Sequence, residues 1–283
     1  KKYTEMVTGV FPALKTDQTI KFNLIIQFPD NNENQDSEKG KTFDGKVVVN
    51  YETPKSFAED TWETIAENTS SDVYKVGDTK TVLIGNKPYT VRIANKSTPA
   101  KCNDSDFSQT ACGFVVEFVD IVEKRVMNSL AKNVGGWRDS EMRTYANGAF
   151  FNNLPEDLRN VIIKTKVISG HGNTTGEENF PSEDKIYLLS AHEVYEDGTS
   201  NQVSTYDSAW DKTRQLDYYK IKGVTTNSYS NAIKQYNSSD SHWWLRAASS
   251  NSDYAFLIVI YSGTWNEYIA ATNQGFAPAF RIG

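Results

Sequence analysis

The chain has few cysteines and histidines, no run of basic residues and no long hydrophobic stretch. Its 283 residues include two Cys and three His, and its net charge is −6 at pH 7. A nucleic-acid-binding protein needs a basic stripe to neutralise phosphates, so no nucleic acid is expected as a partner. No segment approaches the ~20 apolar residues of a membrane span. Because the sequence begins at Lys1 without a leader, we expect membrane attachment only through an N-terminal anchor outside it.

Motifs of catalysis are also missing. There is no HExxH motif and no Gly-x-Ser-x-Gly elbow, and the carboxylates are scattered along the chain. Residues 133–137 lack the lysine and the spacing of a phosphate-binding loop. His171 stands in a turn-forming Ser-Gly-His-Gly-Asn segment, where an exposed loop histidine is the expected reading. The sequence therefore predicts a protein that is not an enzyme and has no cofactor, and it assigns no metal ligands.

Aromatic residues are abundant, with 15 Tyr, 14 Phe and 6 Trp, and 38% of the chain is hydrophobic. This content is sufficient for a folded core and argues against disorder over the whole chain. Tyrosine and tryptophan also anchor many binding surfaces, because each combines an apolar ring with a polar group. Composition leaves both uses open.

Cys102 and Cys112 flank a polar loop, and no nearby Cys or His completes a zinc site. A loop-closing disulfide is one reading, and it would stabilise the fold by roughly 2–3 kcal/mol and favour an oxidising compartment. Two unpaired thiols in a reducing compartment are the alternative.

Residues 1–54 are predicted to form a small β domain or part of a β-sandwich, with strands at 20–28 and 46–51. The acidic loop between these strands offers Asp30, Asp36 and Glu38 as calcium ligands. No EF-hand spacing is present, so a solvated loop is the competing interpretation, and calcium has no motif in its support.

Residues 55–283 are predicted to mix short helices with strands, which indicates an α+β fold. Helices are expected at 56–68, 140–154 and 155–163, with one helical turn at 191–195. Strands are expected at 79–84, 89–94, 114–122, 185–190, 243–246, 254–261 and 277–282.

Several motifs of this second part resemble a known family. They lie at residues 90–95, 109–114, 135–137, 142–145, 154–158, 184–190, 214–219, 243–246 and 278–282. From Phe57 to Gly283 the chain resembles an uncharacterised domain family of surface proteins in gut Firmicutes. That family is similar to the formylglycine-generating-enzyme branch of the C-type lectin fold. The resemblance implies a C-type-lectin-like ligand-binding domain at residues 55–283.

This broader group includes the variable proteins of diversity-generating retroelements, in which adenine-directed mutagenesis rewrites codons near the C-terminus. The C-terminal stretch resembles such a cassette, and the variable region would span residues 247–274. The fixed residues would be Trp243, Trp244, Leu245, Arg246, Phe256, Val259, Gly263, Trp265, Ala270, Gly275, Pro278, Phe280 and Arg281. The residues between them are mostly reachable by mutating the adenines of an AAC codon. Glu267 and Gln274 are not, which departs from the pattern.

The resemblance implies a division between display and scaffold. The expected ligand-binding residues are Ser249, Asn251, Ser252, Tyr254, Ala255, Ile258, Ile260, Tyr261, Ser262, Thr264, Asn266, Tyr268, Ile269, Ala271 and Asn273. The expected scaffold comprises Trp243, Trp244, Arg246, Phe256, Gly263, Trp265, Pro278 and Phe280.

The apolar segment 254–261 allows two readings. It has the composition of a buried central strand, yet the cassette requires exposed positions within it. We expect Phe256 and Val259 in the core, Ile258 and Ile260 exposed, and a β-bulge between the two isoleucines.

Two functions of the resembled families are absent. The copper oxidase chemistry of formylglycine-generating enzymes needs C-terminal cysteines, and no Cys follows Cys112. The calcium-dependent sugar motifs Glu-Pro-Asn, Gln-Pro-Asp and Trp-Asn-Asp do not occur either. The sequence therefore predicts a receptor or adhesin on a cell or virion surface that binds a protein or glycan ligand. A structural, pilin-like surface subunit without a diversified site is the alternative.

Overall fold

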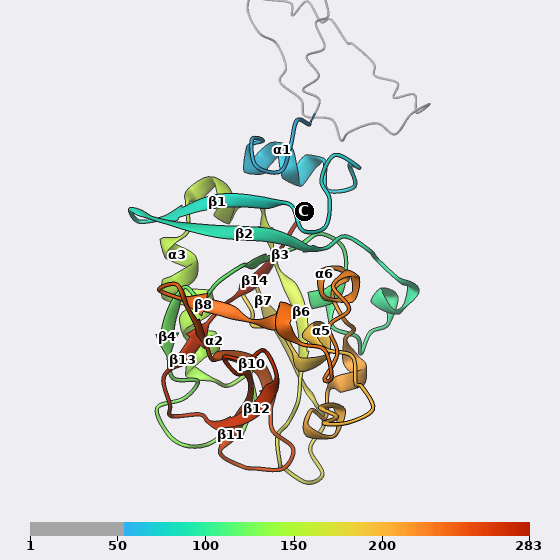
Figure 1. Cartoon of the computed structure of the whole chain (residues 1–283), viewed down its shortest axis with the longest axis vertical. Helices are drawn as coiled ribbons and strands as arrows, with labels where there is room; N and C mark the ends of the chain where they lie inside the picture. Colours follow the sequence, from blue (N-terminus) through green and yellow to red (C-terminus); the bar gives the residue numbers. More distant parts are fainter. Residues whose placement is uncertain (1–53) are drawn as a thin grey trace, which may run out of the picture. The chain divides into compact units, whose positions relative to one another are not determined.

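The computed structural model describes residues 54–283 (Figure 1). The small β domain expected at residues 1–54, and the loop with Asp30, Asp36 and Glu38, fall outside the described residues. Within the described part, helices and sheets are mixed, and the fold is α+β as the sequence predicts. No helix in this part has the length and apolar content needed to cross a membrane.

The first five-stranded sheet joins strands from the beginning and the end of the described chain. Its order is β1 (Thr79–Ile84), β2 (Lys87–Asn95), β3 (Val115–Phe118), β14 (Ala279–Ile282) and β5 (Ile162–Ile163). All four pairings are antiparallel. The predicted hairpin at 79–84 and 89–94 is confirmed, and the C-terminal strand lies in the sheet interior.

The second five-stranded sheet carries the predicted variable region. Its order is β12 (Trp265–Ile269), β11 (Ala255–Val259), β10 (Trp243–Ala248), β13 (Gln274–Phe276) and β4 (Glu123–Arg125). β10 and β13 are parallel, and the other pairs are antiparallel. β11 is enclosed by two neighbours, whereas β12 is an edge strand. Two further hairpins are β6–β7 (Thr165–Ser169, Phe180–Asp184) and β8–β9 (Lys234–Tyr236, Ser239–Ser241).

The helices are short. They are α1 (Trp62–Glu67), α2 (Glu141–Tyr145), α3 (Phe151–Asn153), α4 (Glu156–Val161), α5 (Ala191–Val194) and α6 (Asp217–Ile221). A π-helical turn at Ala146–Phe150 connects α2 to α3, so residues 141–153 are continuously helical. The first helix begins later than expected. The Ser56 hydroxyl accepts from the Glu59 amide, but this turn does not continue into the helix, and the N-cap of α1 is Thr61, whose hydroxyl accepts from the Thr64 amide.

Two predicted strands differ from the structure. The strand expected at 114–122 ends at Phe118, and β4 begins only at Glu123 in the other sheet. The segment 185–190 forms a single bridge, between Tyr187 and Ala279, instead of a strand. Its first two amides donate to the Asn147 side chain rather than to a neighbouring strand, so a side chain replaces the ladder.

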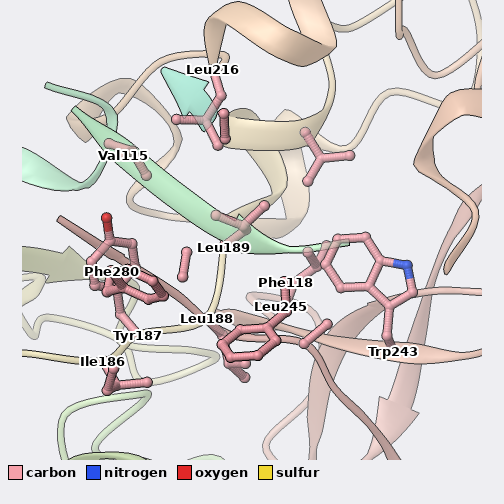
Figure 2. Close-up of a cluster of buried hydrophobic side chains, with 14 of the residues drawn as sticks. Val115, Phe118, Ile186, Tyr187, Leu188, Leu189, Leu216, Trp243, Leu245 and Phe280 are labelled. Atoms are coloured by element: carbon pink, nitrogen blue, oxygen red, sulfur yellow. The ribbon is translucent and has the colours of Figure 1, made fainter. Parts of the chain in front are cut away.

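Both sheets contribute to one core. Trp243 and Leu245 of β10 belong to a single buried cluster (Figure 2). The same cluster contains Phe118 of β3, Phe280 of β14 and Leu188 from the segment after β7. Each of these side chains is fully buried. Such close packing holds β10 in one position, because even a side-chain change of one methylene alters the stability of a close-packed interior. β10 in turn positions the edge hairpin beyond it.

Cys102 and Cys112 are joined by a disulfide, with their Cα atoms 6.0 Å apart. The bridge closes the loop that carries Thr110. The Thr110 side chain is buried, and its hydroxyl accepts a hydrogen bond from Arg246 of β10. Since the cross-link restricts the unfolded chain, it stabilises this loop against opening.

Candidate ligand-binding surface

The edge strand β12 is flanked by three turns that all belong to the predicted variable region. The β10–β11 and β12–β13 connections lie at one end of β12, and the β11–β12 turn lies at the other. Figure 1 shows this hairpin at the lower end of the described part. A ligand lying along β12 would therefore meet residues of β12 and of these three connections.

Seven of the predicted ligand-binding residues are exposed here. They are Asn251 and Tyr254 before β11, Tyr261 in the β11–β12 turn, Asn266, Tyr268 and Ile269 on β12, and Asn273 before β13. We call these seven residues the β12 edge surface. All of them are asparagine, tyrosine or isoleucine. Tyr254, Tyr261 and Tyr268 expose 47%, 58% and 37% of their surface, which is high for aromatic side chains.

Five other predicted contact residues are half-buried: Ser252, Ile260, Ser262, Thr264 and Ala271. Ile260 packs against the core, and Thr264 accepts a hydrogen bond from the Asn201 side chain. These positions border the β12 edge surface and support it.

Three predicted contact residues, Ser249, Ala255 and Ile258, are buried, so the expectation that a ligand touches them is wrong. Ala255 and Ile258 belong to β11, which is covered on both faces and hydrogen-bonded on both edges. Ser249 turns inward and donates its hydroxyl to Glu267. The other prediction for residues 254–261, a buried central strand, is confirmed over β11 (Ala255–Val259).

The expected bulge between Ile258 and Ile260 is also misplaced. β11 pairs with β12 without interruption. The irregularity lies in β10, where Trp244 pairs with Ile258 but Ala248 pairs with Phe256. Extra residues in one strand bend it and re-aim a side chain. Arg246 lies within this bulge, and its backbone amide donates to Leu189 rather than to β11.

The guanidinium of Arg246, which is buried in β10, makes four hydrogen bonds to three other segments of the chain. It forms a two-pronged ion pair with Glu193 of α5, with N–O distances of 2.6 and 2.5 Å, and both side chains are buried. It also donates to the Leu188 carbonyl and to Thr110 of the disulfide loop. Burial alone would raise the pKa of Glu193, but the adjacent Arg246 and the donated hydrogen bonds hold that pKa below its usual value.

A second buried acid lies nearby. Asp207 accepts from the Ser190 hydroxyl and from the Ala209 amide, at 3.0 and 2.9 Å. It makes no direct contact with a cation, and burial raises the pKa of its carboxyl. Because Ser190 is also the N-cap of α5, its hydrogen bond to Asp207 helps to fix the start of that helix.

The tryptophans of the predicted scaffold are each fixed by a hydrogen bond. The indole nitrogens of Trp243, Trp244 and Trp265 donate to the carbonyls of Ala232, Arg125 and Asn201. All eight predicted scaffold residues are buried. Gly263 has a φ of +92°, and an added Cβ would lie 2.3 Å from the Tyr229 carbonyl oxygen. Gly263 thus sets the turn of the hairpin because no side chain fits.

Sequence reasoning missed Asn133. Its buried side-chain amide donates to the carbonyls of Ser249, Ser252 and Ala255, at 3.1, 2.7 and 2.9 Å. These bonds hold the β10–β11 loop that presents Asn251 and Tyr254. No sequence signal marks this role, because the contact spans more than a hundred residues.

An aromatic group extends the β12 edge surface. The His242 ring stacks on Tyr261 at 5.6 Å between ring centroids, and it meets the edge of Tyr268 at 5.9 Å. Burial, with the charge of Lys124, lowers the pKa of His242, so the ring is neutral at pH 7. The surface here is therefore aromatic, with the charged Lys124 nearby.

The three histidines do not meet in the described part. His192 stacks on Trp210, with ring centroids 4.0 Å apart, and its Nδ1 lies 2.8 Å from the Trp210 carbonyl oxygen. His171 lies half-buried in a loop. Across residues 54–283, no group of three or more His, Cys, Asp or Glu side chains is arranged to hold a metal ion.

Residues 115–283 match the protein family described as a domain of unknown function, DUF6273. The match covers more than half of the chain, begins at β3 and includes the whole β12 edge surface, so the chain belongs to this family. No curated protein and no solved structure matches the chain.

Proposed function

We propose that this member of the DUF6273 family is a non-enzymatic ligand-binding protein, a receptor or adhesin, which contacts a protein or glycan through the β12 edge surface. The carrying observation is the composition of that surface. Its seven exposed side chains are asparagine, tyrosine and isoleucine, and they lie on the edge strand β12 and in the turns around it. The neighbouring strand β11 is wholly buried.

The physical chemistry of these residues suits recognition. Tyrosine contributes a large contact area at a low cost in conformational entropy, and asparagine adapts its hydrogen bonds to the partner. Tyr254, Tyr261 and Tyr268 are spread over the length of the hairpin, roughly 17 Å for a five-residue strand. Tyrosine is one of the side chains that most often anchor a binding surface.

The proposal includes a C-type-lectin-like fold for residues 55–283. The return of the C-terminal strand β14 into the sheet of β2 and β3 supports it, as do the short second sheet and the long connections between strands. A cell- or virion-surface location is proposed with it, and the Cys102–Cys112 disulfide supports an oxidising compartment.

The proposal also includes diversification of the β12 edge surface by a retroelement. Its seven residues are all reachable by adenine mutation of an AAC codon, and none is buried. Changes at such positions are usually within about 0.5 kcal/mol in stability, so a scaffold tolerates many of them. The buried Ser249, Ala255 and Ile258 are excluded from the diversified set.

Sequencing of the gene and its neighbourhood tests this proposal. We expect a reverse transcriptase gene beside it and an adenine-rich near-copy of the codons for residues 243–283. Among independent isolates, substitutions should concentrate in the seven codons of the β12 edge surface. A locus without the near-copy, or with substitutions spread equally over buried codons such as that of Ile258, would remove diversification from the proposal.

A further inference from the structure

A cavity of about 430 Å³ opens between two hairpin turns, remote in sheet order from the β12 edge surface. One wall is the start of β2 with Tyr89, and another is the β8–β9 turn with Tyr236. Residues 120–122, just before the opposite edge strand β4, complete it. Figure 1 shows the β1–β2 hairpin and β8 on the left side of the described part. The volume falls within the range of small-molecule sites.

The walls of this cavity are held rigidly. The Gln235 amide donates to Asp120 Oδ1 at 2.9 Å, and the Ile121 amide donates to the Gln235 carbonyl at 3.0 Å. Behind them, the buried Lys234 ammonium donates to the carbonyl of Phe118 and to Glu117, at 2.6 and 2.9 Å. A preformed site avoids the cost of ordering its own side chains on binding.

The turn that borders the cavity has an unfavourable residue. Asn237 and Ser238 have φ angles of +51° and +62°, and they form the two-residue connection between β8 and β9. Such a turn needs positive φ at both positions, which suits Asn followed by Gly. A serine at the second position is strained, and strain of this kind concentrates where a side chain serves a function. Ser238 lines the cavity.

The lining has the chemistry of a site for a polyhydroxylated ligand. Tyr89 and Tyr236 supply aromatic surface, while Gln235, Asn237 and Ser238 supply amide and hydroxyl groups. The lining carries one charge of each sign, from Lys87 and Asp120, and the Lys124 ammonium lies 5.2 Å from the centroid of the Tyr236 ring. A phosphate or nucleic-acid site would instead carry a clear excess of basic groups.

We propose that this cavity binds a neutral carbohydrate, one or two sugar units of a glycan. The tyrosines would pack against the apolar C–H faces of the sugar ring, and the amides and hydroxyls of the β8–β9 turn would bind its hydroxyl groups. This site is separate from the β12 edge surface and does not depend on its proposed function.

Titration of the full chain with neutral disaccharides, followed by amide NMR, tests the proposal. The probes are maltose, cellobiose, lactose and N,N′-diacetylchitobiose, with inorganic phosphate as the charged comparison. We expect at least one disaccharide at millimolar concentration to shift the resonances of residues 87–89, 120–122 and 235–238. If no disaccharide shifts them, or if phosphate alone does, the proposal is overturned.

The variant N237G/S238G separates binding from folding. Two glycines suit the positive φ angles, so the melting temperature should equal or exceed that of the unmodified chain. Loss of the two side chains should weaken disaccharide binding about tenfold, which corresponds to two modest hydrogen bonds. The control Ile221→Ala removes an exposed side chain at the end of α6 and should leave the affinity unchanged. Equal affinity in N237G/S238G would contradict the assignment.

Discussion

Replacement of Arg246 with methionine is expected to lower the free energy of unfolding by about 3–5 kcal/mol, because it leaves the Glu193 carboxylate buried without its partner. Methionine approximates the length of the aliphatic stem but offers no donor to Glu193 or to the Leu188 carbonyl. Urea denaturation followed by tryptophan fluorescence measures the change.

An exposed ion pair provides the control for Arg246→Met. Lys212 contacts Asp106 at 2.5 Å, but the two side chains are 36% and 69% exposed. Water and salt screen such an exposed pair, so Lys212→Met should leave the free energy of unfolding nearly unchanged. Equal losses in the two variants would show that Arg246 does not act through its buried pair.

The pH dependence gives a second readout of the same variant. In the unmodified chain the folded pKa of Glu193 is depressed, so its contribution to stability is present above its unfolded pKa and is lost as pH falls through the folded value. In Arg246→Met, burial without the cation should raise the folded pKa instead. Relative to the unmodified chain, this variant should therefore recover stability as the solution is acidified towards pH 4.

Ile258→Asp is expected to unfold the domain or to destabilise it by about 4 kcal/mol or more. The Ile258 side chain is fully buried on β11, within the hydrophobic core cluster. Thermal unfolding by circular dichroism measures the loss.

Tyr268→Asp is the matched control on the neighbouring strand. Tyr268 lies opposite Phe256, and the next pair on the same face of the sheet is Asn266 opposite Ile258. Unlike Ile258, the Tyr268 side chain is 37% exposed, because β12 is the edge strand. Its replacement should change stability by about 0.5 kcal/mol or less while it alters the binding surface. Similar melting temperatures for the two variants would refute the division between β11 and β12.

Local patterns predicted much of this fold. The β1–β2 hairpin follows from two apolar runs around a Gly-Asn turn, and the helix at 141–153 follows from apolar residues at helical spacing. The tryptophans of the C-terminal stretch could be assigned to the scaffold because large apolar side chains are seldom left exposed together.

Long-range contacts explain what the sequence did not reveal. Ile258 was expected at the surface, yet burial of β11 depends on β10 and β12 pairing on both of its sides. Glu193 and Asn133 lie 53 and 116 residues from Arg246 and Ser249, the partners that give them a role. Periodicity carries no information about contacts at such separations. The cavity beside Ser238 likewise arises from three segments that meet only in the folded chain.

A pair of display libraries measures most directly whether the β12 edge surface is a tolerant binding face on a fixed scaffold. The first library randomises the seven codons of the β12 edge surface. The second randomises seven buried codons of β10, β11 and their connection: Ala247, Ala248, Ser249, Ala255, Leu257, Ile258 and Val259. Both are challenged with chymotrypsin and then selected for binding to purified proteins and glycoproteins.

Most clones of the first library should resist chymotrypsin and yield binders to several targets, and most clones of the second should be degraded. If the first library is degraded as extensively as the second, or if it stays folded but yields no binder to any target, the β12 edge surface is not the binding face.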